Sequence, residues 1–188
     1  METERIVKSA SRIKEQIIFW YLRYYRLEQK AIKGKEGCTL FDKVPGLERE
    51  TILSRIKLST YELPVLLTRV RPEEWILNTT EHFIQIKKSS LEKIPYEQFR
   101  FHEGPLWDEE TARRKIGILR KIGILLGLLE RPVHPKKKGH ILPFGIMLAD
   151  EEIKYWDMPT GDTMFAFWNV TKKCELIGRK YQIEEYRN

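Results

Sequence analysis

The chain has few of the features that mark secreted, membrane or metal-binding proteins. Its 188 residues include only two cysteines, Cys38 and Cys174, which do not form the close pairs of zinc sites, so we expect two reduced thiols and no metal. No run of about 18 apolar residues occurs, because Arg120 and Lys121 interrupt the most apolar stretch, 116–129. The first residues lack an apolar segment followed by a small-residue cleavage site. These absences argue against a membrane-spanning helix and predict a cytoplasmic protein.

Glycine and proline are also scarce, with 11 and 9 residues. This excludes a collagen-like or low-complexity chain, and 41% hydrophobic with 32% charged residues predicts a folded globular protein. At about 100–200 residues per domain, the length favours one compact unit.

The net positive charge of the chain is concentrated in one segment. Residues 113–140 contain nine basic side chains and the single acid Glu130, a net +8, whereas the remainder sums to −1. This segment also lacks aromatic residues, so its contact with a nucleic acid would be electrostatic and independent of sequence. We predict that it binds an acidic surface of a protein partner, with nucleic acid or anionic lipid as the alternative. The predicted binding residues are Arg113, Arg114, Lys115, Arg120, Lys121, Arg131, Lys136, Lys137 and Lys138.

The N-terminal third is predicted to be helical. An apolar stripe at helical spacing predicts a helix over residues 2–34, and the spacing of Ile52, Leu53 and Ile56 predicts a second over 48–57, with a loop between them. The two helices would form an N-terminal arm, residues 1–60. The stripe consists of Ile6, Ile13, Ile17, Trp20, Tyr24 and Leu27.

From Leu63 the pattern changes to short strands. ELPVLLTRV is followed by the turn RPEE, the strand segment WILNTTEHFIQI, the turn KKSS and a strand pair in SLEKIPYEQFRFHEG. Parallel strands would need crossovers of about a dozen residues, so this spacing favours an antiparallel barrel or sandwich.

The last third is predicted to contain two strands and a helix. Residues 116–129 contain three glycines, which disfavour a helix, so the sequence does not decide between a helix and a strand there. An exposed loop is predicted to follow. Two strands then flank the turn Ala149–Glu151. A long amphipathic helix starts at Asp162 or Thr163. One face of this helix consists of Met164, Phe167, Trp168, Thr171, Cys174 and Ile177.

Three phrases, WILNTTEHFIQI, SLEKIPYEQF and DTMFAFWNVTKKCEL, resemble bacterial members of the pleckstrin-homology-like (PH-like) family. The likeness spans about Leu63 to Tyr181, with 106–139 as an insertion. It implies an antiparallel barrel closed by a C-terminal helix and a function of binding without chemistry, to lipid headgroups or to proteins. Lipid-binding members carry a basic cluster between the first two strands. Here that turn is RVRPEEWI, where two glutamates oppose two arginines, which favours a protein partner.

Catalytic motifs are weak. The phosphate-binding and serine-hydrolase glycine patterns do not occur, and we expect the dispersed histidines, His82, His102, His134 and His140, on surfaces or loops. Asp150, Glu152 and Lys154 would share one face of a strand, as in metal-dependent nucleases, where Asp108 would supply the first acid. A solvated charged turn explains the same residues.

The sequence therefore predicts an α+β protein: N-terminal helices (1–60) packed on a PH-like antiparallel β-barrel closed by a C-terminal helix (61–188). The predicted function is non-catalytic binding of a protein partner in the bacterial cytoplasm, as in an immunity protein that neutralises a toxin. No cofactor is expected. An anionic-surface binder is the second hypothesis, and a metal-dependent nuclease is the third.

Overall fold

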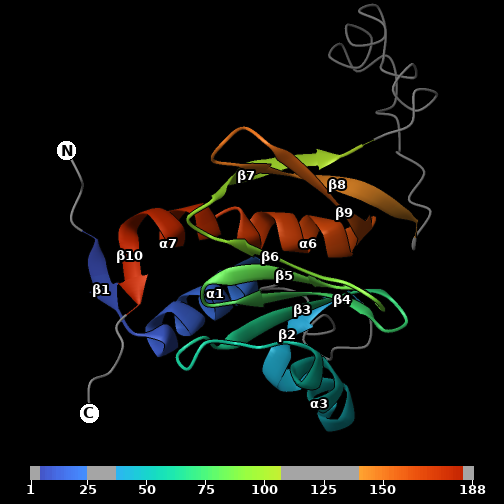
Figure 1. Ribbon diagram of the computed structural model, residues 1–188, viewed down its shortest axis with the longest axis horizontal. Coiled ribbons are helices and arrows are strands. Elements are labelled where there is room, and N and C mark those ends of the chain that lie inside the picture. The colour runs from blue at the N-terminus through green and yellow to red at the C-terminus, as the bar shows by residue number, and fades with distance from the viewer. Residues whose placement is uncertain (1–4, 25–36, 107–139, 184–188) are drawn as a thin grey trace, which may run out of the picture.

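The computed structural model describes residues 5–24, 37–106 and 140–183, which form an α+β fold as predicted (Figure 1). The described elements are β1 (Ile6–Lys8), α1 (Ala10–Tyr24), β2 (Cys38–Leu40), the short 3-10 helix η1 (Phe41–Lys43), α3 (Gly46–Arg55), β3 (Pro64–Arg71), β4 (Glu74–Thr79), β5 (His82–Ile86), β6 (Leu91–Pro95), β7 (Phe99–Pro105), β8 (Ile141–Leu148), β9 (Ile153–Pro159), α6 (Asp162–Thr171), α7 (Cys174–Lys180) and β10 (Tyr181–Ile183).

The described strands form three sheets and no closed barrel, so that prediction is wrong for this part of the chain. One antiparallel sheet has the order β2-β3-β4-β5-β6, a second has the order β7-β8-β9, and β1 pairs in parallel with β10. The predicted strand pair in SLEKIPYEQFRFHEG exists as β6 and β7. A turn at 96–98 separates them, and β7 pairs with β8 instead.

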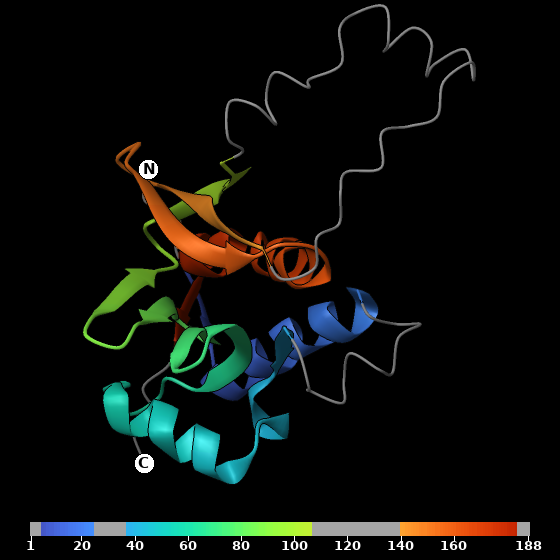
Figure 2. The same ribbon diagram turned by 90° about the vertical axis from the view of Figure 1, so that its right-hand side faces the viewer.

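Helix α6 lies between the two larger sheets and completes the main core (Figures 1 and 2). Its buried Phe167 contacts rings from both sheets, Phe144 of β8 and Phe83 of β5, each with ring centroids 6.0 Å apart. Ile13 and Ile17 of α1 are buried in the same core. Side chains from both sides of residue 60 thus share one core, while the predicted division into an arm and a barrel stays a prediction.

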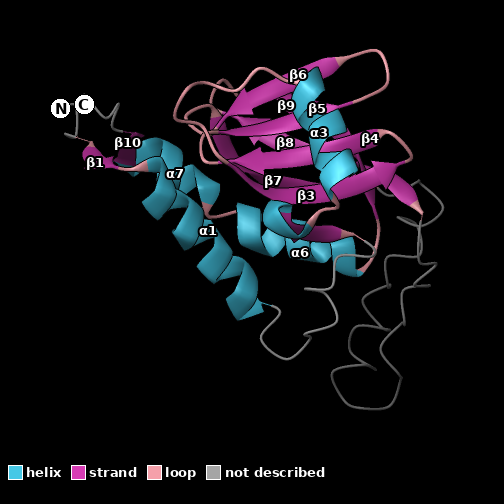
Figure 3. Ribbon diagram, turned by 90° about the horizontal axis from the view of Figure 1, so that it is seen from below, coloured by secondary structure: helices cyan, strands magenta, loops and turns pink. Residues whose placement is uncertain are grey.

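A second core lies on the outer face of the five-stranded sheet, where α3 crosses the strands (Figure 3). Two of the strand residues it includes, Trp75 and Leu77, alternate with Ile76, which points into the main core. Glu48 of α3 accepts hydrogen bonds from Arg69 Nε at 2.8 Å and from Trp75 Nε1 at 3.0 Å, and these tie the helix to the sheet. The predicted second helix is confirmed, although it runs over 46–55. The buried members of this core are Phe41, Val44, Ile52, Leu67, Trp75, Leu77, Ile84 and Ile86.

The N-terminal helix is shorter than predicted, because residues 6–8 form β1. Ile6 is 61% exposed and pairs with Tyr181, so its helical spacing to Ile13 is coincidental. Ser9 caps α1: its carbonyl accepts the N–H of Ile13 at 3.1 Å and its hydroxyl accepts the N–H of Arg12 at 3.4 Å. The segment after α1 was predicted to be a loop, yet residues 38–40 form β2 and extend the sheet beside β3.

The predicted C-terminal helix is two helices, α6 and α7, separated at residues 172–173. Gly161 occupies the N-cap position, so neither Asp162 nor Thr163 caps the helix as expected. The predicted buried face is confirmed, with Trp168 half-buried and its other members buried. At Gly178 a Cβ atom would lie 2.2 Å from the Tyr96 carbonyl, so the close approach of α7 to the turn after β6 requires glycine.

Candidate functional site

The basic residues predicted as a binding site lie outside the described residues. So do the stretch 116–129, whose helix-or-strand choice was left open, and Asp108 and His134. The predicted basic site therefore stays a prediction. These basic residues are Arg113, Arg114, Lys115, Arg120, Lys121, Arg131, Lys136, Lys137 and Lys138.

The nuclease-like pattern does not form the arrangement expected of it. Asp150 lies in the turn between β8 and β9 and not on a strand, where it accepts the N–H of Glu152 at 3.1 Å. Lys154 Nζ lies between the carboxylates of Glu152 at 3.3 Å and Glu92 at 3.0 Å. Within the described ranges, no three His, Cys, Asp or Glu side chains are grouped to hold a metal ion. The geometry favours the solvated charged turn.

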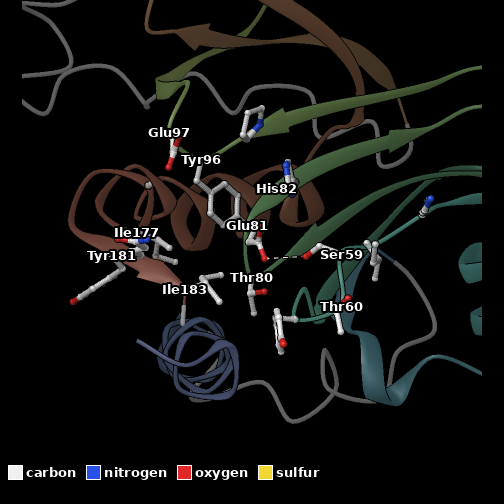
Figure 4. A pocket seen from close by; sticks show the side chains of 16 residues that line it. Ser59, Thr60, Thr80, Glu81, His82, Tyr96, Glu97, Ile177, Tyr181 and Ile183 are labelled. Carbon is white, nitrogen blue, oxygen red and sulfur yellow. Dashed lines mark hydrogen bonds between the residues drawn. The ribbon is translucent and has the colours of Figure 1, made fainter. Parts of the chain in front are cut away.

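A pocket of about 590 Å³ opens where β4 turns into β5, at one end of the five-stranded sheet (Figure 4). Its walls are the loop 57–61 after α3, the β4–β5 turn, the β6–β7 turn, and residues of α7 and β10. The lining combines hydroxyl groups and carboxylates with the tyrosine rings of Tyr96 and Tyr181. This is the candidate functional site.

A buried carboxylate stands behind the pocket wall. Glu62 is 4% exposed and accepts hydrogen bonds from the Thr79 hydroxyl at 2.5 Å, from Nδ1 of His82 at 2.8 Å and from the Ser59 N–H at 3.3 Å. Burial opposes its charge, but the hydrogen bonds from His82 and Thr79 outweigh burial and lower the pKa of Glu62. An ionised carboxylate only accepts hydrogen bonds, so Nδ1 of His82 is the donor in this contact.

A second carboxylate, Glu81, lines the pocket. It is half-buried and accepts a hydrogen bond from the Ser59 hydroxyl at 3.3 Å (Figure 4). Burial raises the pKa of Glu81, and the charge of Glu62 raises it further. Among the described residues, no cation forms an ion pair with Glu81, whereas Glu97 across the pocket is paired with Arg5.

Hydrogen bonds hold the β4–β5 turn in place. The Thr79 hydroxyl oxygen accepts the N–H groups of His82 at 2.8 Å and Glu81 at 3.1 Å, which fixes both pocket residues. The Tyr96 hydroxyl donates to the Thr79 carbonyl at 2.6 Å, and the Thr80 N–H donates to Leu63 at 2.9 Å. The pocket wall is therefore preorganised, which lowers the entropy cost of binding.

Hydroxyl and imidazole groups of the pocket are engaged in hydrogen bonds within its wall. Thr79 is fully buried, and the Ser59 hydroxyl is 3.3 Å from Glu81, beyond the approximate 2.6–3.2 Å contact of an activated nucleophile. Nδ1 of His82 is engaged by Glu62. What the lining offers a ligand is the Glu81 carboxylate, whose pKa burial and Glu62 raise against the opposing charges of His82 and Lys93, beside aromatic and aliphatic surface.

Two other groups of titratable side chains lie in the core. Cys38 and Cys174 are free thiols, as predicted, and both are buried, which raises their pKa values to about 11 and about 12. His102 is buried, contrary to the expectation of a surface or loop position. Its Nε2 lies 2.8 Å from the Thr171 hydroxyl, its Nδ1 has no partner among the described residues, and burial lowers its pKa to about 3.

Comparisons with family models, curated proteins and solved structures found no match to this chain. The PH-like resemblance therefore stays a hypothesis. Among the described helices, none is sufficiently long and apolar to cross a bilayer.

Sequence reasoning did not identify Glu62, Glu81 and His82 as site residues. Glu62 and His82 are 20 positions apart, and the antiparallel β3–β4–β5 meander brings them together. The available signal was the polar run Thr79–Thr80–Glu81–His82 inside an otherwise apolar strand segment, which marks a turn.

Proposed function

We propose that this chain is a non-catalytic binding protein that acts through a protein partner, and that the pocket receives a basic side chain of that partner. The observation that carries the proposal is the Glu81 carboxylate, which is half-buried, lies in a hydrogen-bonded turn and has no ion pair with a described cation, so that burial and Glu62 keep its pKa raised despite the charges of His82 and Lys93.

A lysine or arginine side chain fits the pocket chemically. Its charged head would neutralise Glu81 and relieve the repulsion from Glu62, which together with burial keeps the pKa of Glu81 raised. Its aliphatic stem would pack on Tyr181 and Ile183, which line the same pocket and are partly exposed. A free anion would meet two carboxylates and gain little.

The PH-like resemblance belongs to this proposal. What supports it is that the described antiparallel strands β3–β9 are followed by α6, which packs between their two sheets. Family members of this kind bind without chemistry. We extend the proposal to a cytoplasmic, immunity-type protein that neutralises a toxin by occupying its surface.

A second candidate function is binding of an anionic surface, nucleic acid or membrane, through residues 113–140. Its support is the net charge of +8 in that segment. Such binding would weaken steeply with salt, with a slope of about −0.7 to −0.9 per phosphate contacted. Binding to random DNA or anionic vesicles at physiological ionic strength, with an affinity that falls steeply as salt is added, would favour this function over the first.

The test is a titration of isotope-labelled protein with the peptides acetyl-Gly-Arg-Gly-amide and acetyl-Gly-Gln-Gly-amide, read by amide chemical shifts. We expect the arginine peptide to move the amides of Thr80, Glu81 and His82, and the glutamine peptide to leave them in place. Glu81→Gln should abolish the response.

Glu97→Gln is the matched control, because Glu97 lines the same pocket but already has Arg5 as its partner. It should keep the response of the wild-type protein. Equal shifts with both peptides, or an unchanged response in Glu81→Gln, would overturn the assignment of the pocket to a basic side chain.

A further inference from the structure

The outer face of the three-stranded sheet carries apolar side chains where a solvent-facing sheet would carry polar ones. Phe101, Met147 and Ile153 form one row across the three strands, since Phe101 pairs with Met147 and Met147 with Ile153. In the next row Gly145 pairs with Tyr155. Phe101 is 50% exposed and Tyr155 is 45% exposed. An exposed apolar patch of this kind marks an interaction site.

The alternation along β7 is the reverse of the usual one. Phe101 faces outward, while its neighbour His102 is buried among Phe99, Phe144 and Phe167 on the inner face. An antiparallel sheet with one solvated face normally places its polar residues outside. The three-stranded sheet is therefore apolar on both faces, as expected of a sheet covered on both sides.

The other large sheet shows what such cover looks like. Its outer face bears Trp75, Leu77 and Ile84, which are all buried because α3 and η1 pack over them. The covering helix is ten residues long, which corresponds to about 15 Å. A helix of similar length suffices for the narrower three-stranded sheet.

The charge around this face indicates the chemistry of the missing cover. Strands β7, β8 and β9 with their connecting turn 149–152 contain five acids against two bases, whereas the whole chain has a net charge of +7. Asp157 is paired with Arg71, and Glu152 with Lys154, which leaves Glu103, Asp150 and Glu151 without an ion pair to a described residue. Glu103 lies in the register shift between His102 and Gly104, and a Cβ atom at Gly145 would be 2.8 Å from the Glu103 Cβ. Asp150, Glu151 and Glu152 are exposed at the β8–β9 turn. An acidic rim around an apolar centre is complementary to a basic amphipathic helix.

Gly145 shapes the centre of this face. A Cβ atom there would lie 3.2 Å from Cε1 of Tyr155 and 3.3 Å from Cγ2 of Ile153, so the glycine lets both side chains lie close over β8. At this position the middle strand carries no side chain, and the exposed Tyr155 ring lies beside it.

From these observations we infer that the outer face of β7–β8–β9 is a docking surface for a basic amphipathic helix of a partner protein. Its apolar side would pack on Phe101, Met147 and Tyr155, and its lysines or arginines would face Glu103 and the acidic turn. This surface is separate from the pocket, which lies at the end of the other sheet. The docking proposal and the pocket proposal can therefore be confirmed or refuted independently.

The experiment uses the full chain and two synthetic 14-residue helices, one of leucine and lysine and one of leucine and glutamate in the same pattern. We expect the lysine helix to bind although the protein is itself cationic, and the glutamate helix not to bind. Phe101→Thr and Tyr155→Thr should each weaken binding by about tenfold, the usual loss on removal of an interface aromatic.

Two further variants keep the result interpretable. Glu103→Lys should weaken binding of the lysine helix, because it reverses one charge and leaves the apolar residues of the surface unchanged. Phe19→Gln removes an aromatic that is similarly exposed, but on α1, and should leave the affinity within about twofold.

Four results of the binding experiments would overturn the inference: no binding of the lysine helix, equal binding of both helices, equal loss in Phe19→Gln and Phe101→Thr, or no loss in Glu103→Lys. Sedimentation of the free protein completes the test. If the free protein is a dimer and Phe101→Thr dissociates it, the surface binds a second copy of the chain. That result would overturn the proposal of a partner helix. A monomer supports the inference.

Discussion

The two larger sheets have outer faces of similar apolar character, but only one of them is covered by a described element. On the five-stranded sheet, α3 buries Trp75 to 5% exposure, whereas on the three-stranded sheet Phe101 remains 50% exposed. Side-chain alternation sets which residues face outward in both cases. An apolar outer face is thus a packing surface in either sheet. The covered face contributes to stability, and the open face is available to a partner.

The largest effect should come from the covered face. Trp75→Ala removes a buried ring and its hydrogen bond to Glu48, and should cost about 3–5 kcal/mol of unfolding free energy. Denaturant melts measure this. A loss below about 1 kcal/mol would show that packing of α3 on this face contributes little to stability. The two outer faces would then not differ in their contribution to stability.

The inner face of the three-stranded sheet should respond to acid. His102 has a native pKa of about 3, below its unfolded value of about 6.5, so the unfolded chain takes up a proton first and stability falls as pH falls from about 6.5 to 3. Between pH 7 and 5 the wild-type protein should lose about 2 kcal/mol that His102→Leu does not lose.

The exposed His140 supplies the control for this prediction. His140→Gln should keep the pH dependence of the wild-type protein in melts at pH 7, 6 and 5. Parallel curves for wild type and His102→Leu would contradict the buried neutral histidine.

A smaller effect is expected where α3 is tied to the sheet. Burial opposes the charge of Glu48, but the hydrogen bonds from Arg69 and Trp75 outweigh it and lower its pKa. The contribution of the Glu48 charge to the unfolding free energy is therefore fully present above the pKa of Glu48 in the unfolded chain. It is lost as the pH falls through the lower pKa of Glu48 in the folded protein. Glu48→Gln should cost about 1–2 kcal/mol at pH 7, and less below pH 4. Equal losses at both pH values would mean that the glutamate charge contributes nothing.

The smallest effect should come from the open face. Phe101→Thr keeps a residue that favours strands and removes only a half-exposed ring, so the unfolding free energy should change by less than about 1 kcal/mol. A loss as large as that of Trp75→Ala would show that another part of the chain covers this face.

Local patterns in the sequence predicted much of this fold. The spacing of Ile52 to Ile56 located α3, and the RPEE and Ala149–Glu151 turns delimited β3 and β4 and then β8 and β9. The buried face of the C-terminal helices was also predicted. Hydrophobic spacing was insufficient at Ile6, where pairing with β10 decides the structure, and at the turn 96–98, where long-range strand pairing splits the meander into two sheets.

The candidate sites depend on contacts between distant residues, which a local pattern does not encode. The pocket needs Glu62, Glu81 and Ser59 from two separate turns, and the open face needs rows formed by strands from both sides of residues 107–139. The sequence does show that Phe101, Met147 and Tyr155 are apolar. Only the register shows that they lie together.

The most direct test of the comparison is solvent access to the two outer faces in solution. A soluble paramagnetic agent broadens the signals of side chains that it can approach. We predict strong broadening of the Phe101 and Tyr155 rings, and little effect on Trp75 or on the methyl groups of Leu77 and Ile84. Equal protection of both faces would contradict the account, because the surface of the three-stranded sheet would then already be covered within the free protein.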